Sequence, residues 1–326
     1  LLQGSERPIV LLRKRPGHGF AENIAPGNRD CGVMLPYTPL HHLLFAEGLG
    51  PTVMTSGNYS SEPLAAENED AISRLGGIAD ALLVHNRRIA RAVDDSVVQV
   101  SAGGRIQVCR RARGYVPQPV ELRVGSRSSG AAPAILAVGG ELNNAVCLAR
   151  EGRAVLSEYI GDLVDGRVYR RFVETIDHLE SVFEMHPELI AADMHPQYLS
   201  TSYARKRRRG ELAGRSGADV VHVQHHHAHV AACLAEHGRE GPVVGLACDG
   251  VGYGEDGAAW GCEVLEADLR VYRRLGHLRY LPLVGGDAAA VETYRPAVAA
   301  MYQAFGDRCG EFAGELELPA PRPRIS

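Results

Sequence analysis

The sequence predicts a two-domain protein of the α/β class, and three observations support this. The chain has 326 residues, more than one typical core of roughly 100 to 200 residues needs. Short β-branched runs closed by turn residues alternate with segments of helical periodicity. A stretch rich in Gly, Ser, Ala and Arg has the composition of a linker. We therefore expect domains at residues 1–125 and 133–326, joined by a linker at 126–132.

In the first domain, four runs have the composition of strands: "RPIVLLRKR", "PTVMTSGN", "ADALLVHN" and "DDSVVQVSAGGRIQVCRRARG". The segment "ENEDAISRLGGIADAL" between them has helical periodicity. Strands that alternate with helices in this way indicate a mixed α/β domain.

The second domain begins with "AILAVGGELNNAVCLAREGRAVLSEYIGD", which predicts strands joined by tight turns. Three helix-strand steps follow. A helix over "DGRVYRRFVETIDHLESVFEM" leads to the strand "ELIAADMHP", a helix from near Tyr198 leads to "ADVVHVQ", and a helix that starts at the histidines leads to "VVGLACDG". The basic run at 205–210 is expected to be a solvated last helical turn, where cations favour the negative end of the helix dipole.

Composition limits the function classes. With 35 basic and 39 acidic side chains, the net charge is −4, so the chain has no overall field for nucleic acid or an anionic membrane. The seven cysteines form no CxxC pair, which is typical of reduced thiols in a cytoplasm. We find no apolar run of about 18 residues and no leader segment, and therefore expect a cytoplasmic protein that contacts neither membrane nor nucleic acid.

The stretch "VQHHHAHVAACLAEHG" holds four histidines within five residues. If a helix begins after Gln224, His225 and His229 are at positions i and i+4 on one face, close enough to share a metal ion. His226 and His227 would then point elsewhere. Cys233 lies one turn further along the same face, and we expect it to pack rather than to bind metal.

Asp249 follows the predicted strand "VVGLACDG" and can supply the oxygen ligand that two imidazoles lack. The glycines after it, Gly252 and Gly254 among them, have two interpretations. They can form a hairpin turn around "EDG", or their backbone N–H groups can bind phosphate. The two interpretations are compatible.

Other polar groups also follow predicted strands. "TSGN" places Ser56 and Asn58 at one strand end, and "GGELNN" places Asn143 and Asn144 at another. "CRRARG" adds Arg110, Arg111 and Arg113, whose planar guanidinium groups suit phosphate or carboxylate. Each group alone is compatible with an ordinary turn or an exposed basic strand. Together they favour an anion-binding site for a nucleotide.

At these residues the chain resembles the hydrogenase maturation carbamoyltransferase family, HypF. The resemblance rests on motifs in the same order along most of the chain: "IAPGNRDCGVMLPYTPLHHLL", "VMTSGNYSSEP", "HNRRIARAVDDSVV", "RRARGYVP", "LSEYIGDL", "DMHPQY", "VQHHHAHVAACLAEH" and "DGVGYGEDGAAWGCEVL". It implies that residues 1–125 form the later part of a YrdC-like domain. Residues 133–326 would form the first part of a Kae1-like domain with an actin-like, ribonuclease H-like fold.

The resemblance also implies an activity. The YrdC-like domain of this family forms carbamoyl adenylate from carbamoyl phosphate and ATP, with Mg²⁺ as the counter-ion of ATP. Ser56, Asn58 and the three arginines match its motif positions. The carbamoyl group then passes to the C-terminal cysteine of a partner, HypE, for the cyanide ligands of nickel-iron hydrogenase. The family binds an iron or zinc ion, and the resemblance implies that His225, His229 and Asp249 are its ligands in this chain.

The chain departs from the family pattern at several points. An acylphosphatase-like domain and CxxC zinc fingers are absent, so we expect an internal fragment. Asn143 stands where a lysine is usual, and Val284 replaces a glycine. No catalytic side chain is assigned. Two other functions stay open. One is a carbamoyltransferase with another acceptor, either the hydroxyl of a small molecule, as in an O-carbamoyltransferase, or a tRNA adenosine. The other is a chain that is inert alone and only binds metal or a partner.

Overall fold

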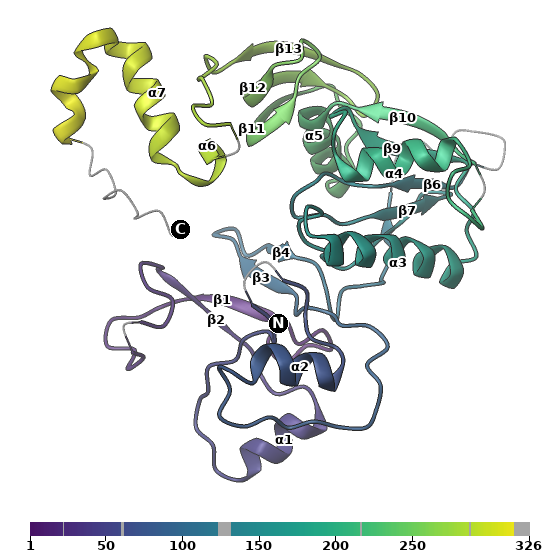
Figure 1. Ribbon diagram of the computed structural model, residues 1–326, viewed down its shortest axis with the longest axis vertical. Coiled ribbons are helices and arrows are strands. Elements are labelled where there is room, and N and C mark those ends of the chain that lie inside the picture. The colour runs from purple at the N-terminus through teal and green to yellow at the C-terminus, as the bar shows by residue number, and fades with distance from the viewer. Residues whose placement is uncertain (22, 60–61, 123–131, 216, 287, 316–326) are drawn as a thin grey trace. The chain divides into compact units, whose positions relative to one another are not determined.

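The computed structural model describes residues 1–21, 23–59, 62–122, 132–215, 217–286 and 288–315. The chain forms two compact units, Leu1–Val223 and Gln224–Ser326, whose elements are labelled in Figure 1. Of the predicted linker 126–132, only Ala132 is among the described residues. The first unit continues across that predicted boundary, and the division at 126–132 stays a prediction.

The first part of the first unit is built on a four-stranded sheet with the order β2-β1-β3-β4. β1 pairs with β2 and β3 with β4 in antiparallel fashion, whereas β1 and β3 are parallel. The elements of this part are β1 (Ile9–Arg13), β2 (Asp30–Val33), α1 (Pro39–Ala46), α2 (Asn68–Leu75), β3 (Val97–Val100) and β4 (Ile106–Arg110).

Two predicted strands are wrong. The runs "PTVMTSGN" and "ADALLVHN" form no strand in the described chain, and Val53 and Leu83 within them are 77% and 73% exposed. Their β-rich composition is a local signal, but a strand needs a neighbour for its backbone hydrogen bonds. The helix predicted between these two runs is confirmed only over α2, because it ends before the glycine pair at 76–77.

The second part of the first unit is a six-stranded sheet with the order β10-β9-β6-β7-β8-β5. β6, β7 and β8 form an antiparallel meander, and β9 and β10 extend it in parallel with β6. The short β5, which lies in the predicted first domain, pairs with β8 at the edge. The strands are β5 (Val120–Glu121), β6 (Ile135–Ala137), β7 (Cys147–Arg150), β8 (Arg153–Leu156), β9 (Leu189–Asp193) and β10 (Asp219–Val223).

Two helices, α3 (Gly166–Val182) and α4 (Leu199–Arg208), cover this sheet. Phe172 of α3 and Tyr203 of α4 are fully buried, and their rings meet edge to face at 5.2 Å. Both helices were predicted, and the basic run at 205–208 forms the last turn of α4 as expected. The prediction that this turn is solvated is wrong for Arg207, which is buried and paired with Glu180. This arrangement of an antiparallel meander, parallel strands and covering helices confirms the predicted mixed α/β fold.

The second unit is a three-stranded antiparallel meander with one helix packed on it. β11 (Val243–Tyr253), β12 (Ala259–Ala267) and β13 (Tyr272–His277) follow α5 (His225–Glu236). Val230 and Leu234 of α5 pack against Leu265 and Ala267 of β12. α6 (Ala288–Val291), α7 (Tyr294–Phe305) and a 3-10 helix (Gly306–Glu315) complete the unit.

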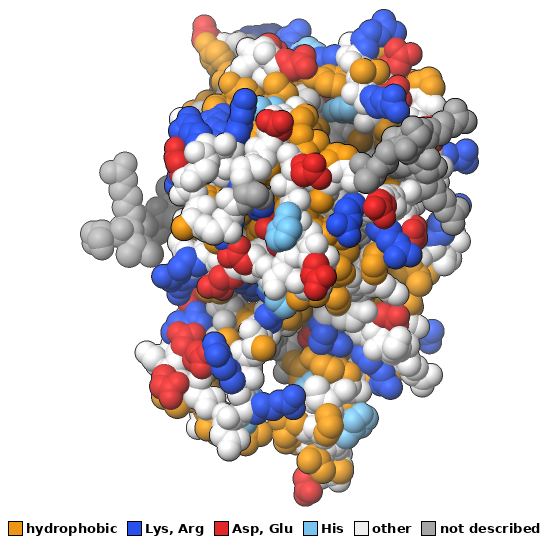
Figure 2. Space-filling model, turned by 90° about the vertical axis from the view of Figure 1, so that its right-hand side faces the viewer, with side chains coloured by type: hydrophobic (Ala, Val, Ile, Leu, Met, Phe, Trp, Pro, Cys, Tyr) orange, Lys and Arg blue, Asp and Glu red, His pale blue; other side chains and the backbone are white. Residues whose placement is uncertain are grey.

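The surface is mixed in charge. On the face that Figure 2 shows, basic and acidic side chains are interspersed among hydrophobic ones. None of the helices within the described ranges combines the length and the apolarity that a bilayer crossing requires.

Asp165 caps the N-terminus of α3, because its Oδ1 accepts a hydrogen bond of 2.7 Å from the Arg167 backbone N–H. We expect Asp165→Ala to lower the free energy of unfolding by about 1 kcal/mol, the usual cost of losing such a cap. Urea unfolding of both proteins at pH 7 measures this. Asp165→Asn is the control, since an asparagine retains the cap without the charge. An alanine variant as stable as the asparagine variant would contradict the capping role.

The Arg167 side chain and then its backbone N–H hold the pKa of Asp165 at about 2. Because this pKa lies below the unfolded value of about 3.9, the charge contributes stability that is complete above the unfolded pKa and is lost as pH falls toward 2. We expect the stability gap between wild type and Asp165→Asn to narrow over that interval. A gap that is unchanged from pH 5 to pH 2 would contradict this effect of the charge.

Candidate functional site

His225, His229 and Asp249 lie together in the second unit, and we call them the His225 triad. Each offers one ligand atom, and these atoms all lie within 4.8 Å of one another. α5 begins at His225, as the sequence predicted, because the Gln224 side chain caps it by accepting from the His227 N–H at 2.9 Å. Asp249 lies on β11, which packs beside this helix.

The triad has the geometry and the charge of a metal site. Asp249 Oδ2 is 2.9 Å from His225 Nε2 and 3.9 Å from His229 Nε2. The His225 side chain at hydrogen-bond distance, and then the nearby His229 side chain, hold the pKa of Asp249 far below its usual range. The carboxylate is therefore ionised and faces two imidazole nitrogens. Two imidazoles and one carboxylate are a donor set that both zinc and non-haem iron accept.

His226 and His227 point away from the triad, as predicted. His226 is fully buried, and its Nε2 donates to the Gly261 carbonyl at 2.8 Å. Its Nδ1 lies 3.3 Å from Gln224 Nε2. Burial lowers the pKa of His226, so the ring is neutral and accepts at Nδ1. His226 thus joins the start of α5 to β12.

Gly252 and Gly254 make room for side chains, and the nucleotide contact expected of them stays a prediction. A Cβ on Gly252 would be 2.5 Å from His226 Cε1, and one on Gly254 would be 2.1 Å from Trp260 Nε1. The turn between β11 and β12 is a hairpin, in which the Gly254 N–H bonds the Ala258 carbonyl at 2.9 Å. The hairpin interpretation is confirmed, and close packing explains these two glycines.

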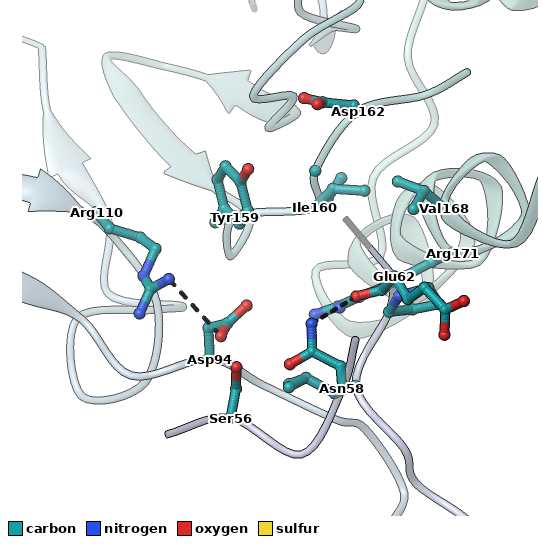
Figure 3. A pocket seen from close by; sticks show the side chains of 13 residues that line it. Ser56, Asn58, Glu62, Asp94, Arg110, Tyr159, Ile160, Asp162, Val168 and Arg171 are labelled. Carbon is teal, nitrogen blue, oxygen red and sulfur yellow. Dashed lines mark hydrogen bonds and ion pairs between the residues drawn. The ribbon is translucent and has the colours of Figure 1, made fainter. Parts of the chain in front are cut away.

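A second candidate site lies in the first unit, and we call it the Arg110 pocket (Figure 3). It has a volume of about 240 Å³ and is lined by Ser56, Asn58, Glu62, Pro63, Leu64, Asp94, Arg110, Tyr159, Ile160, Gly161, Asp162, Val168 and Arg171. It therefore unites three of the predicted residues: Ser56, Asn58 and Arg110. The Asn58 side chain donates to the Glu62 carbonyl at 2.8 Å, and its buried Oδ1 has no hydrogen-bond partner.

Arg110 is held at the pocket without being fully paired. Its Nε donates to the Asp95 carbonyl at 3.0 Å, and its Nη1 is 3.8 Å from Asp94 Oδ1. Arg110 and Arg171 thus supply positive charge to a pocket that also contains Glu62, Asp94 and Asp162. A small anion would compete with Asp94 for the Arg110 guanidinium.

Arg111 and Arg113 do not line this pocket, because other parts of the first unit bind them. Arg111 donates to the carbonyls of Tyr115 at 2.9 Å and Gln118 at 2.8 Å, and burial lowers its pKa. Arg113 pairs with Asp95 at 2.6 Å and lies over the Tyr37 ring at 3.5 Å. Both arginines brace the loop after β4, and neither donates to an open site.

Asn144 is likewise a bracing residue. It is 1% exposed, and its Nδ2 donates to the carbonyls of Val138 at 2.9 Å and Gly140 at 2.6 Å. Asn143 next to it has φ +50° and accepts from the Tyr159 hydroxyl at 3.1 Å. Both amide hydrogens of Asn144 serve the loop after β6, and its buried Oδ1 has no hydrogen-bond partner. The expected nucleotide contact of Asn144 stays a prediction.

A buried carboxylate, Glu158, joins the pocket to the segment before β3. It pairs with Arg91 and lies 3.9 Å from Arg171 Nη2. Arg91 also donates to Thr175 Oγ1 at 3.0 Å, and Arg171 donates to the Ala92 carbonyl at 2.8 Å. These contacts place Asp94 on one side of the pocket and α3 on the other.

Several residues that line the Arg110 pocket were not predicted from the sequence: Glu62, Asp94, Tyr159, Asp162 and Arg171. A signal was present for most of them. Asp94 lies in "HNRRIARAVDDSVV", and Tyr159 and Asp162 lie in "LSEYIGDL", two stretches that carry the resemblance. No residue was selected there because their meeting depends on contacts between distant segments.

Known proteins match the chain along its length. The profile described as "HypF Kae1-like domain" matches residues 130–236, and "Carbamoyltransferase, Kae1-like Domain, second subdomain" matches 245–322. The profile described as "Telomere recombination", for Sua5, YciO and YrdC proteins, matches 1–112. The fold and the sites define a protein with a YrdC-like part followed by a Kae1-like part.

The relatives name the family. Carbamoyltransferase HypF2 of Cupriavidus necator is 48% identical over 343 residues, which cover 100% of this chain and 41% of the relative. Carbamoyltransferase HypF of Synechocystis is 44% identical over 308 residues, covering 94% of this chain and 38% of the relative. A crystal structure of full-length HypF in the phosphate- and nucleotide-bound form superposes with a TM-score of 0.85 at 40% identity, covering 97% of this chain and 40% of that one. The chain belongs to the HypF family and spans about two-fifths of the length of these relatives.

We predict that His225→Ala and His229→Ala each lower the affinity for Zn²⁺ or Fe²⁺ at least about tenfold. Loss of a residue that only hydrogen-bonds to a metal ligand already lowers metal affinity 10- to 100-fold, and these variants lose a ligand itself. Metal content after reconstitution and calorimetric titration measure the effect. Cys233→Ser is the control, because Cys233 lies outside the triad. Cys233 is exposed, so the expectation that it packs is wrong. Equal losses in the Cys233 variant would refute the assignment.

We also predict that Gly252→Ala weakens metal binding although it removes no ligand. Its methyl group would displace His226, whose shift moves the start of α5, at an overpacking cost of about 1–3 kcal/mol. Gly250→Ala is the matched control, since a Cβ there meets nothing within 4 Å. Thermal unfolding and zinc titration of both variants test this. Indistinguishable behaviour of the two would show that the close contact is unimportant.

Proposed function

We propose that the protein acts in the ATP-dependent activation and transfer of a carbamoyl group. In this proposal carbamoyl phosphate, water and ATP, with Mg²⁺ as its counter-ion, give carbamoyl adenylate, pyrophosphate and inorganic phosphate. Water releases the phosphate of carbamoyl phosphate, and the carbamate oxygen then displaces pyrophosphate from the α-phosphorus of ATP. The group then passes to the C-terminal cysteine of HypE, in the cytoplasm, for the cyanide ligands of nickel-iron hydrogenase. The observation that carries the proposal is the Arg110 pocket, which unites Ser56, Asn58 and Arg110 beside several carboxylates.

The size of the pocket favours a small anion. Its volume of about 240 Å³ lies below the roughly 300–1,000 Å³ of pockets that enclose a drug-sized ligand. Carbamoyl phosphate, or the carbamoyl-phosphoryl part of the adenylate, matches it better than a whole nucleotide. Arg110 would bind a phosphate oxygen, since a guanidinium makes charge-assisted, bidentate contacts with phosphate. The unpartnered Asn58 Oδ1 would accept from the carbamoyl NH₂ group.

Formation of the adenylate explains the need for ATP. A mixed anhydride with AMP has a good leaving group, so its carbonyl carbon becomes open to attack by a thiolate such as that of the proposed HypE cysteine. The chain's own residues would bind and orient the small substrate, and effective molarity from such positioning can be large.

We further propose that the His225 triad holds an iron or zinc ion. When bound, such an ion supplies Lewis-acid polarisation or orientation of an oxygen ligand. His225 and His229 would present neutral imidazoles, and the charged Asp249 would offset part of the metal's charge. His226 keeps the start of α5 in place for these ligands through its bond to the Gly261 carbonyl.

A second candidate function is binding alone. The chain spans about two-fifths of the curated relatives, so it can bind small ligands and metal at these two sites without completing the transfer. Two experiments together separate binding alone from carbamoyl transfer: equilibrium dialysis with ATP and with carbamoyl phosphate, and the exchange assay below. Binding without any exchange would favour this candidate.

We expect carbamoyl-phosphate-dependent exchange of labelled pyrophosphate into ATP, and we expect Arg110→Ala to reduce it at least about tenfold. Loss of a hydrogen bond to a charged group costs about 1.5–3 kcal/mol, and 1.4 kcal/mol corresponds to a factor of ten. The measurement is radiolabel recovered in ATP with and without carbamoyl phosphate.

Arg153→Ala provides the matched control, because Arg153 is an exposed arginine paired with Glu121 at 3.1 Å and lines no part of the pocket. Its exchange rate should equal that of the wild type. Exchange that does not depend on carbamoyl phosphate, or that survives Arg110→Ala, would overturn the role of this pocket.

A further inference from the structure

Two cysteines lie directly opposite each other in the sheet of the second unit. Cys248 of β11 and Cys262 of β12 are register partners in an antiparallel pair. Directly opposed residues have Cα atoms roughly 4.5–5.5 Å apart, which lies within the 4.4–6.8 Å that disulfides span. Closing the bond needs an approach of the Cβ atoms by about 1 Å. The backbone therefore already has the spacing of a disulfide.

The two thiols also interact with each other. Both are free in the structure, and a side-chain hydrogen bond with Cys248 is the largest cause that raises the pKa of Cys262. Among the paired strands that the structure describes, this is the only register that sets two cysteines opposite each other.

The pair is accessible from the face of the sheet that α5 does not cover. Cys248 is exposed, and the alternate residues Val244 and Leu246 on the same strand are 70% and 69% exposed. Ala247, which points the other way, is buried against α5. Since successive side chains of a strand alternate between faces, the thiols and the Asp249 carboxylate lie on opposite sides of β11.

We propose that Cys248 and Cys262 are a redox modification site that closes to an intramolecular disulfide. A low-molecular-weight disulfide such as oxidised glutathione is the oxidant. The Cys248 thiolate attacks it and releases one thiolate; the Cys262 thiolate then attacks the Cys248 sulfur and releases the second. The protein loses two electrons and two protons, and the reagent gains them as two thiols.

The position of this site connects it to the metal candidate through the backbone. Cys248 immediately precedes Asp249, and the register between β11 and β12 shifts between Cys248 and Gly252. A bond from Cys248 to Cys262 would clamp the last regular pair before that irregularity. The proposal itself concerns only the covalent pair and does not depend on metal binding or carbamoyl transfer.

The test is a redox titration of the purified chain in mixtures of reduced and oxidised glutathione, quenched with acid and analysed by peptide mass spectrometry. We expect a linked peptide pair containing Cys248 and Cys262 that has lost two hydrogens. The glutathione ratio at half oxidation gives the effective concentration of one thiol at the other. This effective concentration should be at least about tenfold higher in the folded chain than in the chain unfolded by concentrated guanidinium chloride, because folding holds the thiols together.

Exposed cysteines without an opposing thiol are the internal control. Cys233 and Cys109 should give only mixed disulfides with glutathione. Cys147, whose pKa burial raises to about 11, should react least. In Cys262→Ser, Cys248 should stop at the mixed disulfide, and Cys248→Ser should show no link.

Two results would overturn the proposal. One is a Cys248 that remains a mixed disulfide in the wild-type chain. The other is an effective concentration equal in the folded and unfolded chain. Circular dichroism of each variant establishes that it is folded, and the wild-type titration decides the question without any variant.

Discussion

The Arg110 pocket of the first unit depends on the ionic contacts of the buried Glu158 carboxylate. It is 5% exposed at its side chain and faces both Arg91 and Arg171. Removal of one partner from such a buried pair costs about 3–5 kcal/mol, because the remaining charge stays desolvated. Glu158 follows β8, whereas Arg91 precedes β3 by several residues. One ion cluster therefore fixes two distant segments, and the Arg110 pocket lies where they meet.

In the second unit, too, the candidate site depends on two elements that pack against each other. α5 and the β11–β12 hairpin present the His225 triad, and neither would hold it alone. The Gly261 carbonyl accepts from His226, and the glycine at 252 leaves space for that ring. Because the contact is too close for a Cβ, the glycine and the histidine constrain each other. This packing therefore positions the candidate metal ligands His225, His229 and Asp249.

The sequence predicted what depends on local geometry. The pairing of His225 with His229 follows from helix periodicity once a helix starts after Gln224, and the structure adds that the Gln224 side chain caps this helix. Predictions from the sequence failed where the interacting residues are far apart along the chain. Arg110, Arg111 and Arg113 are similar residues in one run, but only Arg110 lines the pocket, since Asp95, Tyr115 and Gln118 bind the other two. Two β-rich runs likewise have no strand beside them, which composition could not indicate.

Asn144 and His226 show why polar residues beside a site need not belong to it. Both are almost fully buried, and a buried donor without an acceptor costs about 1–3 kcal/mol. Each therefore donates to backbone carbonyls: Asn144 to those of Val138 and Gly140, and His226 to that of Gly261. A side chain that also has to bind a ligand must keep a group exposed or unpaired. His229, with a side chain that is 56% exposed, and Asn58, with its unpartnered Oδ1, meet that condition. Asn144 Oδ1 also lacks a partner, but Asn144 lines no part of the Arg110 pocket. An unused hydrogen-bonding group at an open site, rather than residue type, thus separates the ligand candidates from their supports.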